Sequence, residues 1–497
     1  MTKKFYITTT LPYVNADPHI GFAMEIIRAD AIARFKRLLG YEVVFNTGTD
    51  EHGQKIYQKA VKEKKDPKLY CDEYATKFNN LKMALNLSYT HFIRTTDEHH
   101  IKAAREFWQR CQKNNDIYKT KYQIKYCVGC ELEKTDSELI DNKCSLHPKQ
   151  NLEIIEEENY FFKFSKYQQL LLDFYNKNPD FVQPKFRFEE IIAFVKKGLK
   201  DFSISRLKSK MPWGILVPND ETQVIYVWFD ALINYISTLG WPNDDKNFKN
   251  FWPGTQLAGK DNLRQQSAMW QAMLMSAGLP NSKQIFIEGF ITANGQKMSK
   301  SLGNVINPFS LVKKYDTDSV RYYLLKEIPP FGDGDFSYRR MEEIYNADLA
   351  NELGNLVSRL TNLGEKDELE IKDKFSTGSN FKYPSSEVEK QFNNFQFNLI
   401  LENIWKQIKT LNKQIDDFAP WNKKQAERKD FLLQCFKTLK SIGWQLLPFL
   451  PETSEKILKS TQGKIKKNPP LFPKLSIGVI PREPFDFAQG KLGDRGI

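Results

Sequence analysis

Residues 5–46 read FYITTTLPYVNADPHIGFAMEIIRADAIARFKRLLGYEVVFN, a predicted strand, loop, helix and second strand. Residues 5–9 and 41–46 are rich in β-branched and aromatic side chains. Gly21–Leu39 has apolar residues at helical spacing and is followed by Gly40. A helix between two strands carries the chain back to the end of the sheet where the first strand began, so the second strand runs parallel to the first. The pattern predicts an α/β fold with a Rossmann-like, doubly wound parallel sheet.

The rest of the chain divides by pattern. From about residue 116 to 202 it turns to Cys/His pairs and short alternating strands, which indicates an insertion into the α/β fold. After about residue 338, long amphipathic helices predict an all-α C-terminal bundle. We therefore expect a first half of the α/β domain (1–115), a connective insertion (116–212), a second half (213–290), a lysine-containing loop region (291–337), the helical bundle (338–475) and a tail (476–497).

Composition narrows the class of protein. The 497 residues suit about three domains, and 41% of them are hydrophobic. The 73 Lys and Arg exceed the 61 Asp and Glu, giving a net charge of +12. This excess suits a polyanionic partner such as nucleic acid, and it also fits a lysine-rich proteome. No apolar run approaches the ~18 residues of a membrane helix, and the N-terminus MTKK lacks a signal segment, so we expect a cytoplasmic protein with no membrane association.

Three of the six cysteines cluster with a histidine in the predicted insertion. Cys127 and Cys130 form a CxxC pair, Cys144 and His147 form a CxxH pair, and thirteen residues separate the pairs. Together they supply three thiolates and an imidazole, which complete a tetrahedral Zn²⁺ site. Because four protein ligands leave no position open for substrate, we predict one structural zinc ion.

Two further segments carry groups suited to phosphate. PHIG, residues 18–21, lies between the first strand and the first helix, where helix N–H groups and the helix dipole favour an anion. His19 can donate to a phosphate oxygen, although a lone loop histidine is more often structural. NGQKMSKSLGN, residues 294–304, holds Lys297 and Lys300 between glycines, and their ammonium groups suit a triphosphate. Alone, this segment also fits an exposed polar turn.

PHIG and KMSKS, residues 297–301, together resemble the two signatures of class I aminoacyl-tRNA synthetases. Four further segments resemble the methionyl-tRNA synthetase family, and the likeness extends over about residues 4–475. They are TLPY at 10–13, GTDEHG at 48–53, YVWFDA at 226–231 with Tyr235 after it, and GKDN at 259–262. The resemblance implies a ligase that activates L-methionine with ATP and Mg²⁺ and transfers it to tRNA(Met). It also implies that residues 291–337 combine the KMSKS loop with a stem-contact region.

The resemblance implies particular site residues. For ATP they are His19, Gly21, Asp261, Lys297 and Lys300, with His19, Lys297 and Lys300 also catalytic. For methionine they are Leu11, Tyr13, Asp50, Trp228 and Tyr235. Asp50 would pair with the substrate ammonium, and the rings would pack on the polarizable thioether. Without the resemblance, Trp228 and Tyr235 fit ordinary core packing.

The helical region resembles the family's anticodon-binding domain at ANELGNLVSR, residues 350–359, and at APW, residues 419–421. This implies that Asn355 and Arg359 read base edges and that Trp421 stacks on an anticodon base. A packed tryptophan at a helix entry is the alternative. The chain ends about 75 residues after Trp421, so we expect no appended tRNA-binding domain, and we expect a monomer.

Three positions depart from the family pattern where a histidine is common. Phe22 ends the first signature, Gln266 falls in the predicted methionine pocket, and Glu288 begins the step EGF. Loss of one donor to a transition state lowers a rate by about 10²–10³. Two alternatives therefore stand beside a methionine–tRNA ligase. One is a non-catalytic tRNA-binding or regulatory paralogue, and the other is a class I synthetase for another amino acid.

Overall fold

The computed structural model describes residues 2–130, 132–134, 139–298, 303–372 and 386–475. Its main sheet has six parallel strands in the order β3 (His91–Arg94), β2 (Glu42–Thr49), β1 (Lys4–Thr8), β14 (Thr255–Gly259), β15 (Gln284–Glu288) and β9 (Val182–Gln183). The chain winds outward in both directions from the central strands β1 and β14. The predicted doubly wound parallel sheet is therefore confirmed.

Neighbouring residues of the central strands enter opposite cores. Ile7 packs in the core that contains α1 (Ile20–Leu38), whereas Tyr6 packs in the core that contains α5 (Glu98–Lys113). In β15, Phe286 packs in the core that contains α1 and Ile287 packs in the core that contains α5. Because both faces are buried, these strands read as apolar runs rather than as alternating patterns.

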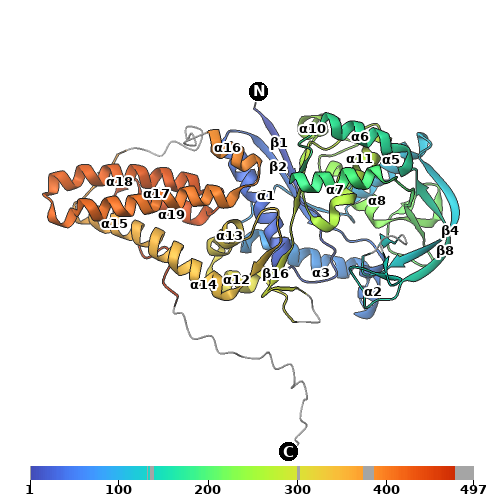
Figure 1. Ribbon diagram of the computed structural model, residues 1–497, viewed down its shortest axis with the longest axis horizontal. Helices are drawn as coiled ribbons and strands as arrows, with labels where there is room; N and C mark the ends of the chain where they lie inside the picture. The colour runs from blue at the N-terminus through green and yellow to red at the C-terminus, as the bar shows by residue number, and fades with distance from the viewer. Residues whose placement is uncertain (1, 131, 135–138, 299–302, 373–385, 476–497) are drawn as a thin grey trace, which may run out of the picture.

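The segment after α5 forms an antiparallel ribbon at one edge of the molecule (Figure 1). Its long strands β4 (Ile117–Cys127) and β8 (Glu153–Phe162) pair with each other. Two short strands extend this sheet, β5 (Leu132–Glu133) beside β4 and β10 (Phe202–Ser203) beside β8. Within the same segment, α6 (Gln168–Lys177) and α7 (Lys185–Lys196) flank β9, the edge strand of the main sheet. The predicted insertion thus also completes the sheet, and its boundaries stay a prediction.

The lysine-containing region is built on a second, smaller sheet. It consists of β16 (Ile291–Ala293), β17 (Gln296–Lys297) and β18 (Gly334–Phe336). Helices α12 (Pro308–Tyr315) and α13 (Thr317–Lys326) connect β17 to β18. The other helices of the α/β part are α2 (Gln54–Lys62), α3 (Pro67–Asn79), α4 (Leu81–Ala84), α8 (Val227–Ala231), α9 (Asn234–Ser237), α10 (Asp245–Phe251) and α11 (Trp270–Ser276).

A helical bundle projects from the α/β part (Figure 1). It comprises α14 (Tyr338–Ile344), a π-helical segment (Tyr345–Gly354), α15 (Asn355–Lys366), α16 (Ser386–Asn393), α17 (Phe397–Phe418), α18 (Gln425–Leu446) and α19 (Pro451–Ser460). The predicted helical C-terminal region is confirmed, with one short addition: β19 (Glu370–Ile371) pairs antiparallel with β20 (Gly463–Lys464). The predicted tail lies outside the described residues. Among the described helices, none is both long and apolar enough to span a bilayer.

Arg321 of α13 joins the bundle to the α/β part. Its buried guanidinium donates to Asp30 of α1 at 2.8 Å and to the carbonyl of Leu85 at 3.1 Å. It also donates to the carbonyls of Pro448 at 3.1 Å and Phe449 at 2.7 Å, between α18 and α19. One buried cation therefore fixes α1 relative to the bundle.

Candidate functional site

The predicted phosphate residues meet at the carboxyl ends of β1 and β14, where the winding direction reverses. His19 is the N-cap of α1, and its Nδ1 accepts a hydrogen bond from the Gly21 N–H at 3.1 Å. Asp261 lies in the turn directly after β14. Strand ends at such a reversal diverge and leave a crevice in which α/β proteins bind ligands. We therefore expect His19, Gly21 and Asp261 to lie on the two sides of such a crevice.

Lys297, at the end of β17 in the small sheet, lies near Phe290 and Asp261. Its Nζ lies 5.8 Å from the centre of the Phe290 ring, and Lys260 Nζ lies 4.4 Å from that ring. Desolvation raises the pKa of Asp261, and the charges of Lys297 and Lys260 act against this increase. Lys297 and Asp261 are thus close enough to interact electrostatically. Lys300 falls outside the described residues, so its role stays a prediction.

Three of the predicted methionine-binding residues lie together. The rings of Tyr13 and Trp228 meet edge to face, with centroids 6.4 Å apart. Tyr13 and Asp50 form a parallel β-bridge, because the Asp50 N–H donates to the Pro12 carbonyl at 3.0 Å and the Asp50 carbonyl accepts from the Val14 N–H at 3.2 Å. The Asp50 side chain is only 3% exposed. This arrangement places a carboxylate beside two half-buried aromatic rings.

Tyr235 and Gln266 form a second, deeper part of the site. Both are buried, and Gln266 Nε2 donates to the Tyr235 hydroxyl at 2.7 Å. Gln256 donates in turn to Gln266 Oε1 at 3.2 Å. Gln266 belongs to a π-helical turn, a distortion that often occurs at functional sites. Leu11 is half-buried in the loop two residues before Tyr13.

Asp230 of α8 is held by two histidines beneath this region. Its carboxylate accepts from His52 Nδ1 at 2.6 Å and from His100 Nε2 at 2.8 Å, and Asp230 and His100 are fully buried. Burial alone would raise the pKa of Asp230, but the two imidazoles outweigh it and lower the pKa. The network ties the GTDEHG segment to the YVWFDA segment, two of the six family segments.

Asp230→Asn is expected to destabilise the protein in a pH-dependent way. Because the folded pKa lies below the usual Asp value of about 3.9, the charged pairing stabilises above about pH 4 and is lost as the pH falls through the folded pKa. At pH 7 the variant should unfold about 6 °C lower, since breaking a buried charge pair costs ~3 kcal/mol. The difference should shrink between pH 5 and pH 3. A gap that stays constant would contradict the charge pairing, and exposed Asp245→Asn serves as the control.

The structure accounts for two of the three departures from the family pattern. Phe22 points into the core, where its ring meets Phe78 edge to face at 5.4 Å, so it is a packing residue of α1. Gln266 retains donor and acceptor roles toward Tyr235 and Gln256. Glu288 is 3% exposed and pairs with Arg28 of α1 at 3.5 Å.

Glu25 was not among the predicted site residues. It is buried, and its carboxylate accepts from the Thr10 N–H at 2.6 Å and the Thr10 hydroxyl at 2.7 Å. Burial raises the pKa of Glu25 well above its usual range, and the charges of Glu288 and Asp261 add to the increase. Glu25 is therefore close enough to Asp261 to interact with it electrostatically. The available signal was two charged residues, Glu25 and Arg28, in the otherwise uncharged first half of the helical segment, residues 20–29.

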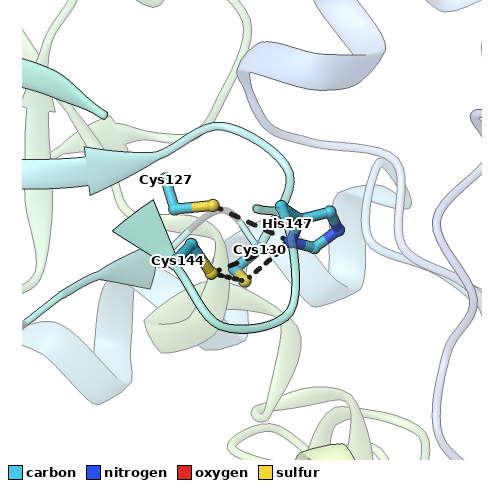
Figure 2. Close-up of side chains that lie close together, drawn as sticks. All are labelled: Cys127, Cys130, Cys144 and His147. Carbon is cyan, nitrogen blue, oxygen red and sulfur yellow. Dashed lines mark hydrogen bonds between the residues drawn. The ribbon is translucent and has the colours of Figure 1, made fainter. Parts of the chain in front are cut away.

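The four predicted zinc ligands converge at one point (Figure 2). Their ligand atoms all lie within 4.8 Å of one another. His147 Nδ1 lies 3.1 Å from Cys130 Sγ and 3.8 Å from Cys127 Sγ, and Cys130 and Cys144 sulfurs are 3.4 Å apart. Ligand atoms of a tetrahedral zinc site are about 3.3–3.8 Å apart, given Zn–S near 2.3 Å and Zn–N near 2.0 Å. The donor set and spacing therefore fit Zn²⁺.

Gly129 makes this compact arrangement possible. A Cβ at position 129 would lie 2.6 Å from the His147 ring, closer than real side chains approach. Val128, also between the two cysteines, packs against a small apolar cluster of Tyr126, Tyr226 and Val227, and so do Tyr13 and Trp228. The knuckle and the candidate methionine-binding residues therefore share one apolar cluster.

The predicted anticodon residues lie on the bundle. Asn355 and Arg359 are one helical turn apart on α15, and Arg359 donates to Asp416 near the end of α17 at 2.5 Å. Trp421 lies five residues beyond Asp416 and is 58% exposed. This exposure does not fit a packed tryptophan. The contact between α15 and the end of α17 brings the three residues to the same region of the bundle.

Comparisons with known proteins identify the family of this chain. The family model described as "tRNA synthetases class I (M)" matches residues 5–144 and 129–361. A methionine–tRNA ligase of Thermosynechococcus vestitus is 42% identical, over 96% of this chain and 93% of its own length. The Thermotoga maritima enzyme is also 42% identical, over 92% of this chain and 75% of its own. A Mycobacterium tuberculosis methionyl-tRNA synthetase in complex with methionyl-adenylate superposes with a TM-score of 0.87 at 35% identity, covering 95% of this chain and 100% of its own. The chain therefore belongs to the methionyl-tRNA synthetase family of class I aminoacyl-tRNA synthetases.

Proposed function

We propose that this protein is a methionine–tRNA ligase that forms methionyl-adenylate from L-methionine and ATP and then esterifies tRNA(Met). The observation that carries the proposal is the adjacency of two groups of residues. His19 and Asp261 lie after the central strands β1 and β14, and Lys297 interacts electrostatically with Asp261. Tyr13 and Asp50, in the loops that follow β1 and β2, pair with each other, and the Tyr13 ring meets Trp228 of α8. Relatives at 42% identity carry this name.

The proposed chemistry assigns each residue a role in positioning or charge stabilisation. Asp50 pairs with the ammonium of methionine, whose carboxylate attacks the α-phosphorus of ATP in line. Pyrophosphate leaves, stabilised by Lys297 and Lys300, while His19 donates to a phosphate oxygen and Asp261 binds the ribose. Mg²⁺ accompanies ATP as part of that substrate. Such a reaction needs positioning and electrostatic stabilisation more than covalent catalysis.

In the second step, a terminal ribose hydroxyl of tRNA attacks the methionyl carbonyl and AMP leaves. The bundle would hold the anticodon through Asn355, Arg359 and Trp421. Cys127, Cys130, Cys144 and His147 would hold one Zn²⁺, which supplies folding energy to the knuckle rather than chemistry. The monomeric state and the cytoplasmic location remain predictions.

Amino-acid-dependent ATP–pyrophosphate exchange tests the proposal. The purified, zinc-loaded protein should exchange with methionine and with none of the other standard amino acids. Exchange with a different amino acid would identify a synthetase of other specificity. A folded, zinc-containing sample that binds tRNA but exchanges with no amino acid would instead identify the non-catalytic paralogue.

Trp421→Ala is expected to impair tRNA charging while leaving methionine activation intact. Loss of one aromatic–base stack costs about 1–3 kcal/mol, so kcat/KM for tRNA(Met) should fall at least about tenfold. The ATP–pyrophosphate exchange rate should stay unchanged, because position 421 lies in the projecting bundle. Leu433→Ala, a similarly exposed apolar side chain on α18, is the matched control. Unchanged charging by the Trp421 variant would refute the anticodon role.

A further inference from the structure

Arg28 lies at the middle of α1, the helix whose first turn carries His19 and Gly21. It is 1% exposed, and its guanidinium is surrounded by four acceptors. Nη2 donates to the carbonyls of Ile328 at 3.0 Å and Pro329 at 2.9 Å. Nη1 donates to the carbonyl of Pro330 at 3.4 Å and lies 3.5 Å from Glu288 Oε2. A planar fork of donors suits this arrangement better than the point charge of a lysine.

The acceptors of Arg28 lie in the segments that precede two of the three strands of the small sheet, β16 and β18. Glu288 ends β15, and only two residues separate it from the start of β16. Residues 328–330 precede β18, which pairs in parallel with β16. β17, which ends at Lys297, pairs with the other side of β16. Arg28 therefore ties the helix of one signature to the sheet that carries the other.

The segments that precede β16 and β18 pack tightly against each other. A Cβ at Gly289 would lie 2.0 Å from the carbonyl oxygen of Gly332, so only glycine allows this approach. The Phe290 N–H donates to Asp333 Oδ1 at 2.9 Å, and Lys260 binds the same carboxylate at 2.7 Å. A shift at Glu288 would therefore displace Phe290 and its neighbours Lys260 and Lys297.

We propose that Arg28 and Glu288 are a positioning pair that sets the distance between α1 and the lysine-bearing sheet, and hence the closure of the ATP crevice. The proposal rests on the proposed function, because it concerns ATP use by the same site. It explains why glutamate is accepted where the family commonly has a histidine. Glu288 Oε1 has no hydrogen-bond partner among the described residues, so its contribution here is its charge toward Arg28 rather than a hydrogen-bond network.

Kinetics of the pair test the proposal. In ATP–pyrophosphate exchange, Arg28→Gln should lower kcat/KM for ATP by about 30-fold or more, because small displacements of reacting groups cost up to about 10²-fold. KM for methionine should change less than threefold. Arg28→Lys should recover part of the loss, since it keeps the charge without the fork. Glu288→Gln should also impair ATP use, and the Arg28→Gln/Glu288→Gln double variant should lose less than the product of the two single losses.

Arg37→Gln is the matched control, because Arg37 lies on the same helix and its guanidinium binds only Ser88 among the described residues. It should match wild type for both substrates. Unchanged ATP kinetics in a folded Arg28→Gln protein would overturn the proposal. Equal losses for ATP and methionine, with a lowered unfolding temperature, would also overturn it and identify a purely structural pair.

ATP affinity measured by calorimetry without methionine separates this inference from the proposed function. If wild type binds ATP but does not exchange with methionine, the proposed function fails. A tenfold or greater weakening of ATP binding in Arg28→Gln would then still support the positioning pair, and equal affinity would refute it. A wild-type protein that binds no ATP would overturn both.

Discussion

Asp50→Asn is expected to raise KM for methionine about 10²-fold in ATP–pyrophosphate exchange. The Asp50 side chain is almost fully buried, so a bound ammonium group would interact with it in a low dielectric. Truncating one partner of such a charge pair costs about 2–5 kcal/mol. Since the adenine and phosphate contacts would be left in place, KM for ATP should change less than about threefold.

The control for this substitution is Asp17→Asn, in the loop between β1 and α1. Asp17 is exposed and pairs with Lys77 at 3.2 Å. It carries the same charge without the burial, so its kinetics should match wild type. Equal effects of Asp50→Asn on both substrates would place Asp50 in the fold rather than in methionine recognition.

Removal of the metal is expected to be as damaging as the loss of Asp50. One zinc per chain should be found by elemental analysis, and Cys144→Ser should retain less than about a tenth of it. Structural zinc contributes ~10 kcal/mol or more to folding of a small knuckle, so residues around Cys127–His147 should unfold. Because Val128 packs against the same small apolar cluster as Tyr13 and Trp228, kcat/KM for methionine should fall at least about tenfold.

Cys435→Ser provides the thiol control, since Cys435 is buried in the bundle away from the knuckle. It should keep one zinc and full exchange activity. A Cys144→Ser protein with one tightly bound zinc would show that the metal lies elsewhere. Full activity after complete zinc removal would refute the prediction that the folded knuckle supports methionine binding.

Local patterns in the sequence were enough to predict the centre of the fold. The β1–α1–β2 unit follows from strand and helix periods separated by loop residues, and its observed bounds lie within three residues of the expected ones. The zinc cluster follows from two close ligand pairs, because short loops hold each pair in position. Both signals arise from residues that are close in sequence.

Contacts between distant segments could not be predicted in the same way. Arg28 and Glu288 are 260 positions apart, and no periodicity links them. The two-residue strand β9 pairs with β15 although nothing in its short sequence distinguishes it from a loop. The sequence shows that Phe22 replaces a histidine donor, but it does not show the packing of its ring against Phe78. Such features depend on tertiary packing rather than on local preference.

The bond network of Arg321 bears on how this protein can evolve. Two of its donors end on carbonyls between α18 and α19. If the bundle were exchanged for an unrelated module, these N–H groups would be left buried without acceptors, at about 1–3 kcal/mol each. Recombination at this boundary is thus selected against. A change in tRNA preference would arise by point substitutions on the bundle surface, with its inner junction inherited intact.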